Sequence, residues 1–133
     1  MIDTGRKQTG VVLKSRSILI VEDEHVTALN LMKILEDAGC KVIGPAATVA
    51  GAHACIADNR IDAALLDINL GKDTRIFPVA EVLAALRVPF AFVSGHPRSL
   101  MPPHLHGHAF IAKPFGSGQI IATVKELLSS DRC

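Results

Sequence analysis

The sequence has no excess of charge of either sign. Its 133 residues include 14 Lys and Arg against 13 Asp and Glu, a formal net charge of +1. A surface for nucleic acid or for an anionic membrane needs a clear basic excess, so we expect neither partner. No apolar run approaches the roughly 20 residues that span a bilayer. Residues 1–10 also lack the apolar segment of a secretory signal.

Cysteine is scarce, and its spacing carries no motif. The three cysteines are odd in number, and none forms a CxxC pair; they are Cys40, Cys55 and Cys133. This pattern favours reduced thiols over a disulfide framework or a zinc site. Together with the missing membrane and secretory segments, it leads us to expect a cytoplasmic protein.

What is present indicates one globular domain behind a polar tail. Hydrophobic residues make up 49% and charged residues 20% of the chain, which is typical of a folded domain with a substantial core. Residues 1–16 hold four basic side chains against Asp3 alone. We predict a flexible tail over residues 1–16 and a domain over residues 17–133. A docking segment for an acidic partner is the alternative for the tail.

One short apolar run ends in Asp67. Five of the six residues before it, from Ile61 to Leu66, are apolar, which favours a strand buried on both faces of a parallel sheet. Asp67 would then lie at the carboxyl edge, where open α/β sheets bind their ligands. The alternative is structural: Asp67 begins a turn that continues through Asn69 and Gly71.

A second apolar run, Ile18 to Val21, ends in three consecutive acids. If its strand is parallel to the first, Glu22 and Asp23 gather beside Asp67, and such crowded like charges favour a bound cation. Oxygen ligands alone favour a hard ion such as magnesium. The alternative is that the acids cap the next helix, but one acid would suffice for that.

Strand and helix patterns alternate along the rest of the chain. We expect helices over residues 25–38, after Thr48, over residues 79–86 and after Ser117, and further strands over residues 41–44, 90–93 and 109–112. Five strands alternating with helices predict a doubly wound α/β sheet.

The region between the last two strands departs from this alternation. Pro97, Pro102 and Pro103 oppose a long helix. The region also holds four histidines, His96, His104, His106 and His108. We interpret it as a solvated loop. A zinc or nickel site built on the alternating pair His106 and His108 is the weaker alternative.

The last two strands also end in polar groups. The hydroxyl of Ser94 could donate to a phosphate oxygen, while Gly95 would leave room for it. Lys113 would supply a cation, and the Lys113–Pro114 peptide bond is a candidate for the cis form. Three carboxylates, a hydroxyl and a lysine at one edge predict a phosphoryl-transfer site. No Walker-type loop is present, so ATP is not the evident donor.

With these motifs in order, the chain resembles the receiver domain of two-component response regulators over about residues 17–130. The resemblance rests on Val21-Glu22-Asp23-Glu24, Leu66-Asp67-Ile68-Asn69, Val93-Ser94-Gly95 and Lys113-Pro114-Phe115. It implies a flavodoxin-like five-stranded parallel sheet in the order 2-1-3-4-5.

The resemblance also implies roles for the site residues. Asp67 would accept a phosphoryl group from a sensor histidine kinase or a histidine phosphotransfer protein. Magnesium would be held by Glu22, Asp23 and Asp67 and by the backbone carbonyl of Asn69. Ser94 and Lys113 would bind the phosphoryl group, and Phe110 would be the aromatic switch residue.

The stretch Pro-Phe-Ala-Phe-Val-Ser-Gly, residues 89–95, further resembles the receiver subgroup named FAT GUY after its motif. Members of that subgroup tend to have an atypical fourth helix, the helix between the last two strands. Here Val93 and Ser94 stand where the motif has Ala and Thr, and His96 follows the glycine. The prolines around this helix leave open which face of the domain acts on a downstream protein.

Three functions remain to be weighed. The leading hypothesis is a stand-alone receiver, not an enzyme on external substrates, that signals by binding a downstream protein; whether it forms a homodimer is open. The second is a phosphorylation-independent scaffold that retains the pocket. The third is a phosphatase like the haloacid dehalogenases, which is disfavoured because Asn69 stands where that chemistry needs a second carboxylate.

Overall fold

A computed structural model of the chain describes residues 12–71, 74–97 and 101–129. Residues 1–11 of the predicted tail lie outside the described residues, as does Cys133. The described segment before the first strand packs on the domain. Leu13 is buried, and the Ser15 amide donates to the carbonyl of Gly39 (2.8 Å). Among the described residues, contacts with the domain therefore begin at Leu13.

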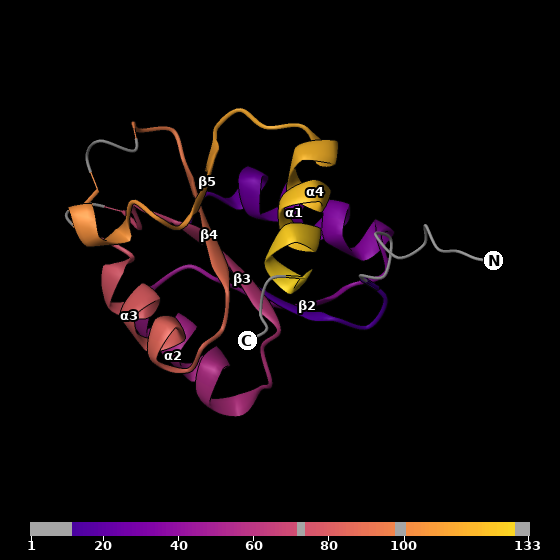
Figure 1. Ribbon diagram of the computed structural model, residues 1–133, viewed down its shortest axis with the longest axis horizontal. Helices are drawn as coiled ribbons and strands as arrows, with labels where there is room; N and C mark the ends of the chain where they lie inside the picture. The colour runs from indigo at the N-terminus through magenta and orange to yellow at the C-terminus, as the bar shows by residue number, and fades with distance from the viewer. Residues whose placement is uncertain (1–11, 72–73, 98–100, 130–133) are drawn as a thin grey trace.

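The five strands form one parallel sheet in the order β2-β1-β3-β4-β5 (Figure 1). This confirms the predicted fold class and strand order. The bounds are β1 Ser17–Val21, β2 Lys41–Ala46, β3 Ala63–Asp67, β4 Phe90–Ser94 and β5 Ala109–Ala112.

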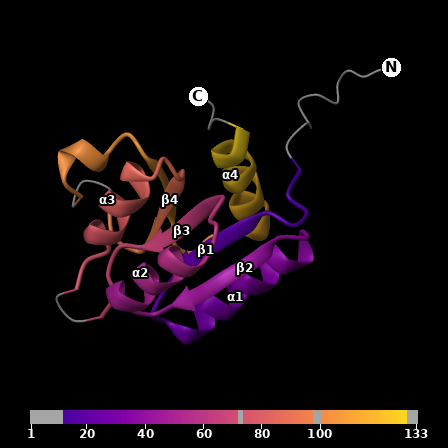
Figure 2. The same cartoon turned by 90° about the horizontal axis from the view of Figure 1, so that it is seen from below.

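Two helices cover each face of the sheet. The helices α1 (His25–Asp37) and α4 (Ser117–Ser129) share one core, whereas α2 (Val49–Asp58) and α3 (Phe77–Ala85) share the other. Figures 1 and 2 show α2 and α3 side by side and apart from α4. None of the described helices is long and apolar enough to cross a membrane.

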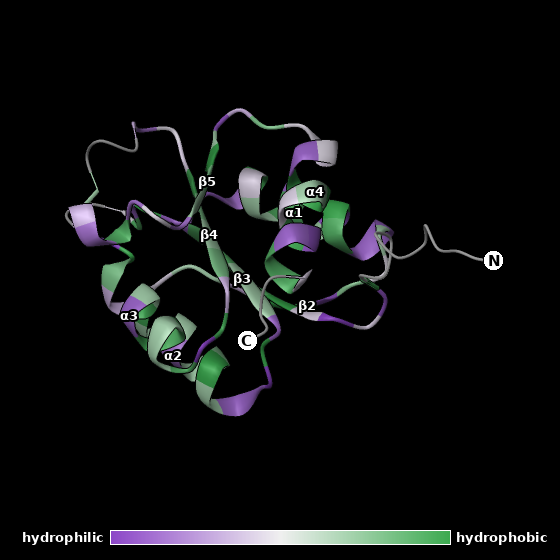
Figure 3. Ribbon diagram, in the orientation of Figure 1, coloured by the Kyte–Doolittle hydropathy of each residue, from purple (hydrophilic) through white to green (hydrophobic). Residues whose placement is uncertain are grey.

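The sheet is apolar because it is covered on both sides. Every residue of β3 and β4 is buried, and Figure 3 shows the central strands coloured as hydrophobic over most of their length. Along β1 the side chains alternate between the two cores: Ile18 packs toward α1 and α4, and Leu19 toward α2 and α3. The polar residues that end β3 and β4, Asp67 and Ser94, are therefore buried as well.

Between β4 and β5 the described residues contain no α-helix. They hold only the 3-10 turn η3, Pro103–Leu105, which agrees with the expected atypical fourth helix; residues 98–100 of this region lie outside the described part. Met101 and Leu105 are buried in the core shared by α2 and α3. These two side chains anchor the segment to the domain.

The histidines of this region have separate partners. His104 Nε2 lies 2.9 Å from Glu81 Oε2, and His106 Nε2 lies 2.8 Å from the Met101 carbonyl oxygen. The ring of His108 stacks on Phe90 with centroids 4.3 Å apart. Among the described residues the histidines do not come together as ligands, so the structure gives no support to the alternative of a zinc site.

Candidate functional site

The register of the sheet brings the acids together. In the pairing of β1 with β3, Val21 lies beside Leu66, so the residues after Val21 reach Asp67. One oxygen from each of Glu22, Asp23 and Asp67 lies within 4.8 Å of the others. Glu22 and Asp67 are buried, whereas Asp23 is exposed. The cluster is thus open to solvent on the side of Asp23.

Lys113 reaches this cluster from the end of β5. Its Nζ atom lies 3.0 Å from Glu22 Oε1 and 3.6 Å from Asp67 Oδ2. The pairing of β4 with β5 sets this position, because the Lys113 amide donates to the carbonyl of Ser94 (2.9 Å). The Lys113–Pro114 peptide bond is cis.

Ser94 lies at the same edge, at the end of β4. Its side chain is 1% exposed, and its Oγ atom accepts a hydrogen bond from the His96 amide (3.0 Å). Apart from its two chain neighbours, no atom of the described residues would lie within 4 Å of a Cβ atom on Gly95. Packing therefore does not require a glycine here, and the proposed room for a phosphoryl group remains a prediction.

Asn69 contacts the acidic cluster directly, whereas Phe110 is a residue of β5. The Asn69 amide donates to Asp67 Oδ1 over a long 3.4 Å; the metal-binding role of its carbonyl stays a prediction. Phe110 lies beside Phe92 across β4 and β5 and is partly buried against the core of α2 and α3. Its switch role likewise remains a prediction.

The surroundings of Asp67 oppose its ionisation. Burial is the main reason that its pKa rises from 3.8 to about 7, and the hydrogen bond and charge of Glu22 raise it further. Lys113 and the Asn69 amide act in the opposite direction but do not compensate. Burial alone would lower the pKa of Lys113, yet it is raised overall, because Glu22, Asp67 and Glu24 stabilise the ammonium.

The cluster fits a hard divalent cation. It offers only carboxylate oxygens, the donors that Mg²⁺ prefers. Glu22 Oε1 is buried and has no directed hydrogen bond among the described residues, although the ammonium of Lys113 is close to it. A cation would supply that oxygen with a partner and would offset the burial of Asp67 and the repulsion from Glu22, which together raise the pKa of Asp67.

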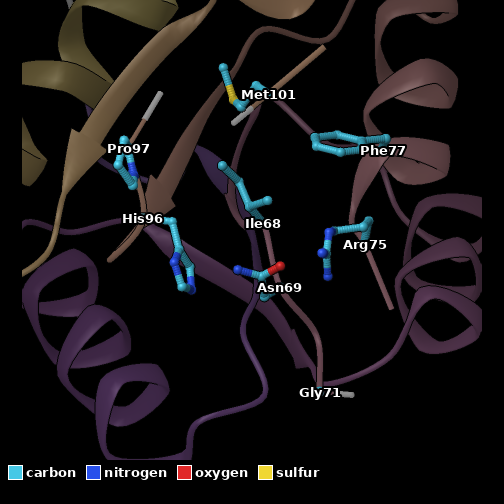
Figure 4. Close-up of a pocket in the computed structure, with 8 residues that line it drawn as sticks. All are labelled: Ile68, Asn69, Gly71, Arg75, Phe77, His96, Pro97 and Met101. Carbon is cyan, nitrogen blue, oxygen red and sulfur yellow. The ribbon is translucent and has the colours of Figure 1, made fainter. Parts of the chain in front are cut away.

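A cavity of about 490 Å³ opens beside the acidic cluster. Figure 4 shows Asn69 between Arg75 and His96, with Phe77 and Met101 on the far side of Ile68. The sequence did not predict this cavity, because its walls come from three separate stretches of chain. Nor did it predict that Glu22, rather than Asp67, is the nearer partner of Lys113. Neither feature has a signal in the local sequence pattern.

The fold and this edge define a class of protein: a flavodoxin-like α/β domain with a buried aspartate in an acidic cluster beside a lysine. The response regulator receiver domain family matches residues 18–125. The chain belongs to this family.

Known relatives agree. The phyllosphere-induced regulator PhyR of Methylorubrum extorquens is 31% identical over 114 residues, which are 84% of this chain but only 43% of PhyR. The solution structure of SdrG from Sphingomonas melonis Fr1 is 38% identical and superposes with a TM-score of 0.77, covering 86% of this chain and 97% of SdrG. A response regulator receiver protein from Sinorhizobium medicae WSM419 is 28% identical, with a TM-score of 0.76 and coverage of 90% and 99%.

Proposed function

We propose that the protein is a phosphoacceptor of a two-component system or phosphorelay and that Asp67 carries the phosphoryl group. The observation that carries this proposal is the position of Asp67, which ends a buried strand 3.6 Å from Lys113 and within the acidic cluster. A carboxylate held beside a cation at an open sheet edge is suited to attack phosphorus and to hold the product.

The donor in this proposal is a phosphohistidine on a sensor kinase or phosphotransfer protein. A carboxylate oxygen of Asp67 forms a bond to phosphorus while the P–N bond breaks. The electron pair of that bond stays on the imidazole nitrogen, which takes up a proton. The product is an aspartyl phosphate on this chain and a free histidine on the donor.

The residues around Asp67 take separate parts in this transfer. Lys113 pairs with the phosphoryl oxygens and offsets their charge. The Ser94 hydroxyl, now accepting from the His96 amide, can turn to donate to a phosphoryl oxygen. Glu22, Asp23, Asp67 and the carbonyl of Asn69 would hold Mg²⁺, which when bound supplies charge neutralisation for the phosphoryl group.

The proposed output is binding to a downstream protein. Phosphorylation shifts a two-state equilibrium that includes Ser94 and Phe110 and thereby changes the surface near β4 and β5. The proposal includes a cytoplasmic location. Homodimerisation remains an alternative form of output.

Intact-mass spectrometry tests the acceptor. The protein is incubated with Mg²⁺ and phosphoramidate, whose P–N bond mimics that of phosphohistidine. Wild type should gain the mass of one phosphoryl group, and Asp67→Asn should gain none. The matched control is Asp58→Asn, which changes an exposed acid at the end of α2 and should label like wild type. Labelling of Asp67→Asn would contradict the assignment.

Two alternatives give different outcomes. A phosphorylation-independent scaffold would bind its partner equally well as wild type and as Asp67→Asn. A phosphatase would turn over a small phosphoester many times, but Asn69 lacks the acid that such turnover needs. The matched family is a receiver family rather than an enzyme family.

A further inference from the structure

The chain after β3 folds back on itself before α3. Two backbone hydrogen bonds of 2.9 Å join the two arms of this loop, with the amides of Leu70 and Ile76 donating to the carbonyls of Thr74 and Ile68. Between them lies the antiparallel bridge of Asn69 with Arg75. A bridge that is flanked by hydrogen bonds in this way is a non-hydrogen-bonded pair, in which the opposite Cα atoms are only about 4.5 Å apart. Arg75 is therefore the cross-strand neighbour of Asn69.

Asn69 and Arg75 share the open face of this loop. Their neighbours Ile68, Leu70 and Ile76 are buried, whereas Asn69 is half-buried and Arg75 is exposed. Side chains that lie opposite each other in an antiparallel pair point to the same side and interact. Figure 4 shows the guanidinium of Arg75 turned toward Asn69 in the cavity that both residues line. The positive charge of Arg75 is thus directed toward Asn69.

Asn69 in turn lies at the carboxylate of Asp67. Its amide donates to Asp67 Oδ1 over 3.4 Å, whereas Lys113 Nζ lies 3.6 Å from Asp67 Oδ2. The two oxygens of Asp67 therefore face different elements, the lysine at the end of β5 and the loop after β3. This loop also borders Asp23, because a Cβ atom on Gly71 would lie 3.7 Å from Asp23 Oδ2. The loop thus reaches both Asp67 and the exposed side of the acidic cluster.

A phosphoryl group on Asp67 would need more positive charge than Lys113 and one magnesium ion supply. The group brings nearly two negative charges, and Glu22 and Asp23 add one each. Mg²⁺ and Lys113 together leave about one of these charges without a partner. Lys113 is moreover the nearer partner of Glu22, at 3.0 Å, so its charge is shared. An arginine keeps its charge throughout the accessible pH range, which makes Arg75 a constant source of the missing charge.

We infer that Arg75 is a second phosphoryl-binding cation. Its guanidinium donates to the phosphoryl oxygens on Asp67 from the loop before α3, while Lys113 does so from the end of β5. Arginine suits this part because its planar fork can donate two parallel hydrogen bonds to a phosphate group. Its flexible stem of three methylene groups lets the fork move from Asn69 to a phosphoryl group. The inference rests on the proposed function of Asp67 and adds a residue outside the four motifs of the family resemblance.

The affinity for beryllofluoride, a phosphoryl mimic, tests this contact at saturating Mg²⁺, with the NMR shifts of Asp67 as the measure of the bound fraction. Arg75→Met keeps an unbranched side chain but removes the donors. It should weaken beryllofluoride binding about tenfold, the loss expected for one hydrogen bond to a charged group. Arg75→Lys keeps the charge without the fork, so its affinity should fall between those of Arg75→Met and wild type.

The matched control is Arg60→Met, which makes the same change at the opposite edge of the sheet. The Arg60 side chain is 90% exposed and precedes β3, so this variant should bind beryllofluoride like wild type. Phosphoramidate labelling should be slower for Arg75→Met than for Arg60→Met by a similar factor, because the transferred group is also negatively charged. Equal affinities and equal rates of these two variants would overturn the inference.

Magnesium binding without beryllofluoride separates a direct contact from a structural effect. Removing a positive charge beside the acidic cluster should leave the Mg²⁺ affinity unchanged or slightly increase it. Damage to the loop would instead weaken Mg²⁺ and beryllofluoride binding together, because the loop supplies the Asn69 carbonyl to the proposed metal site. Weaker binding of both ligands by Arg75→Met would overturn the inference, even if urea unfolding showed an intact fold.

The behaviour of wild type distinguishes failure of this inference from failure of the proposed function. If wild type neither binds beryllofluoride nor gains the mass of a phosphoryl group, Asp67 is not an acceptor and both proposals fall. If wild type does both and Arg75→Met matches it, only the role of Arg75 is lost. The expected result is that wild type binds and is labelled, while Arg75→Met does both about tenfold less well at an undiminished Mg²⁺ affinity.

Discussion

Lys113 lies closer to Glu22 than to Asp67. The Nζ atom is 3.0 Å from Glu22 Oε1 and 3.6 Å from Asp67 Oδ2. Since the lysine charge is shared, it does not offset the burial of Asp67 and the repulsion from Glu22, and the pKa of Asp67 stays near 7. Glu22 thus raises the proton affinity of Asp67 and at the same time holds the lysine at the site.

Replacing Lys113 should make Asp67 still harder to ionise. Lys113 lowers the pKa of Asp67, so Lys113→Met should raise it above its present value of about 7. Loss of this charge should also slow phosphoramidate labelling about a hundredfold, a typical effect of removing one stabilising group from a transition state. NMR titration of the Asp67 carboxyl carbon measures the pKa, and intact-mass spectrometry measures the rate.

The matched control for that variant is Lys125→Met, which removes an exposed lysine on α4. It should leave both the pKa of Asp67 and the labelling rate unchanged. If Lys113→Met behaved like this control, the lysine would have no electrostatic role at the acceptor.

The raised pKa of Asp67 predicts a pH dependence of stability without divalent cations. Between pH 3.8 and about pH 7, Asp67 keeps a proton in the folded state that it has lost in the unfolded state. The contribution of Asp67 to the free energy of unfolding therefore falls as pH rises through this window. Below this pH window Asp67 does not affect stability. Above it the buried carboxylate destabilises the fold by about 1.4 kcal/mol for each unit by which folding raises the pKa of Asp67.

Asp67→Asn tests this sign. Urea unfolding across the window should show a flatter pH dependence for Asp67→Asn than for wild type, with the variant more stable at the alkaline end. Asp58→Asn, an exposed change, should keep the wild-type slope. A wild-type stability that rose with pH while Asp67→Asn stayed flat would mean that Asp67 is ionised more easily in the folded state.

Much of this site could be predicted because local pattern and sheet geometry agree. Buried parallel strands read as short apolar runs, and their polar last residues must meet at the carboxyl edge. The pattern alone predicts that Asp67, Ser94 and Lys113 lie at this edge. The strand order, in contrast, came from the family resemblance, because periodicity does not say which strands are neighbours.

Features that depend on contacts between distant segments could not be predicted. Which acid is nearer to Lys113 depends on side-chain rotamers across two strands.

Magnesium should stabilise the wild-type fold through the acidic cluster. A ligand that binds only the folded state raises the free energy of unfolding by about 2.7 kcal/mol at a hundred times its Kd. Asp23→Asn removes an exposed carboxylate of the cluster without disturbing the core and should weaken Mg²⁺ binding about tenfold, a shift of roughly 1.4 kcal/mol. Thermal unfolding with increasing Mg²⁺ measures the effect.

The neighbouring acid Glu24 provides the control. Its carboxylate accepts from the Thr27 hydroxyl and is not part of the acidic cluster. Glu24→Gln should therefore keep most of the response to Mg²⁺. An equal loss in both variants would indicate general charge screening at the start of α1 instead of a metal site.

Two glycines near the carboxyl edge should differ in how much stability their replacement by alanine costs. Gly44 has a φ of +94°, and a Cβ atom there would lie 2.7 Å from the Ala46 amide nitrogen and 2.9 Å from the Ile20 carbonyl oxygen. Gly44→Ala should therefore destabilise the fold by about 2–3 kcal/mol, measured by urea unfolding. The added methyl group of Gly95→Ala would meet no atom of the described residues within 4 Å beyond its chain neighbours, so this variant should change stability by less than about 0.5 kcal/mol. If Gly95 leaves room for a phosphoryl group, Gly95→Ala should nevertheless slow labelling of Asp67, and a normal rate would show that this space is not used.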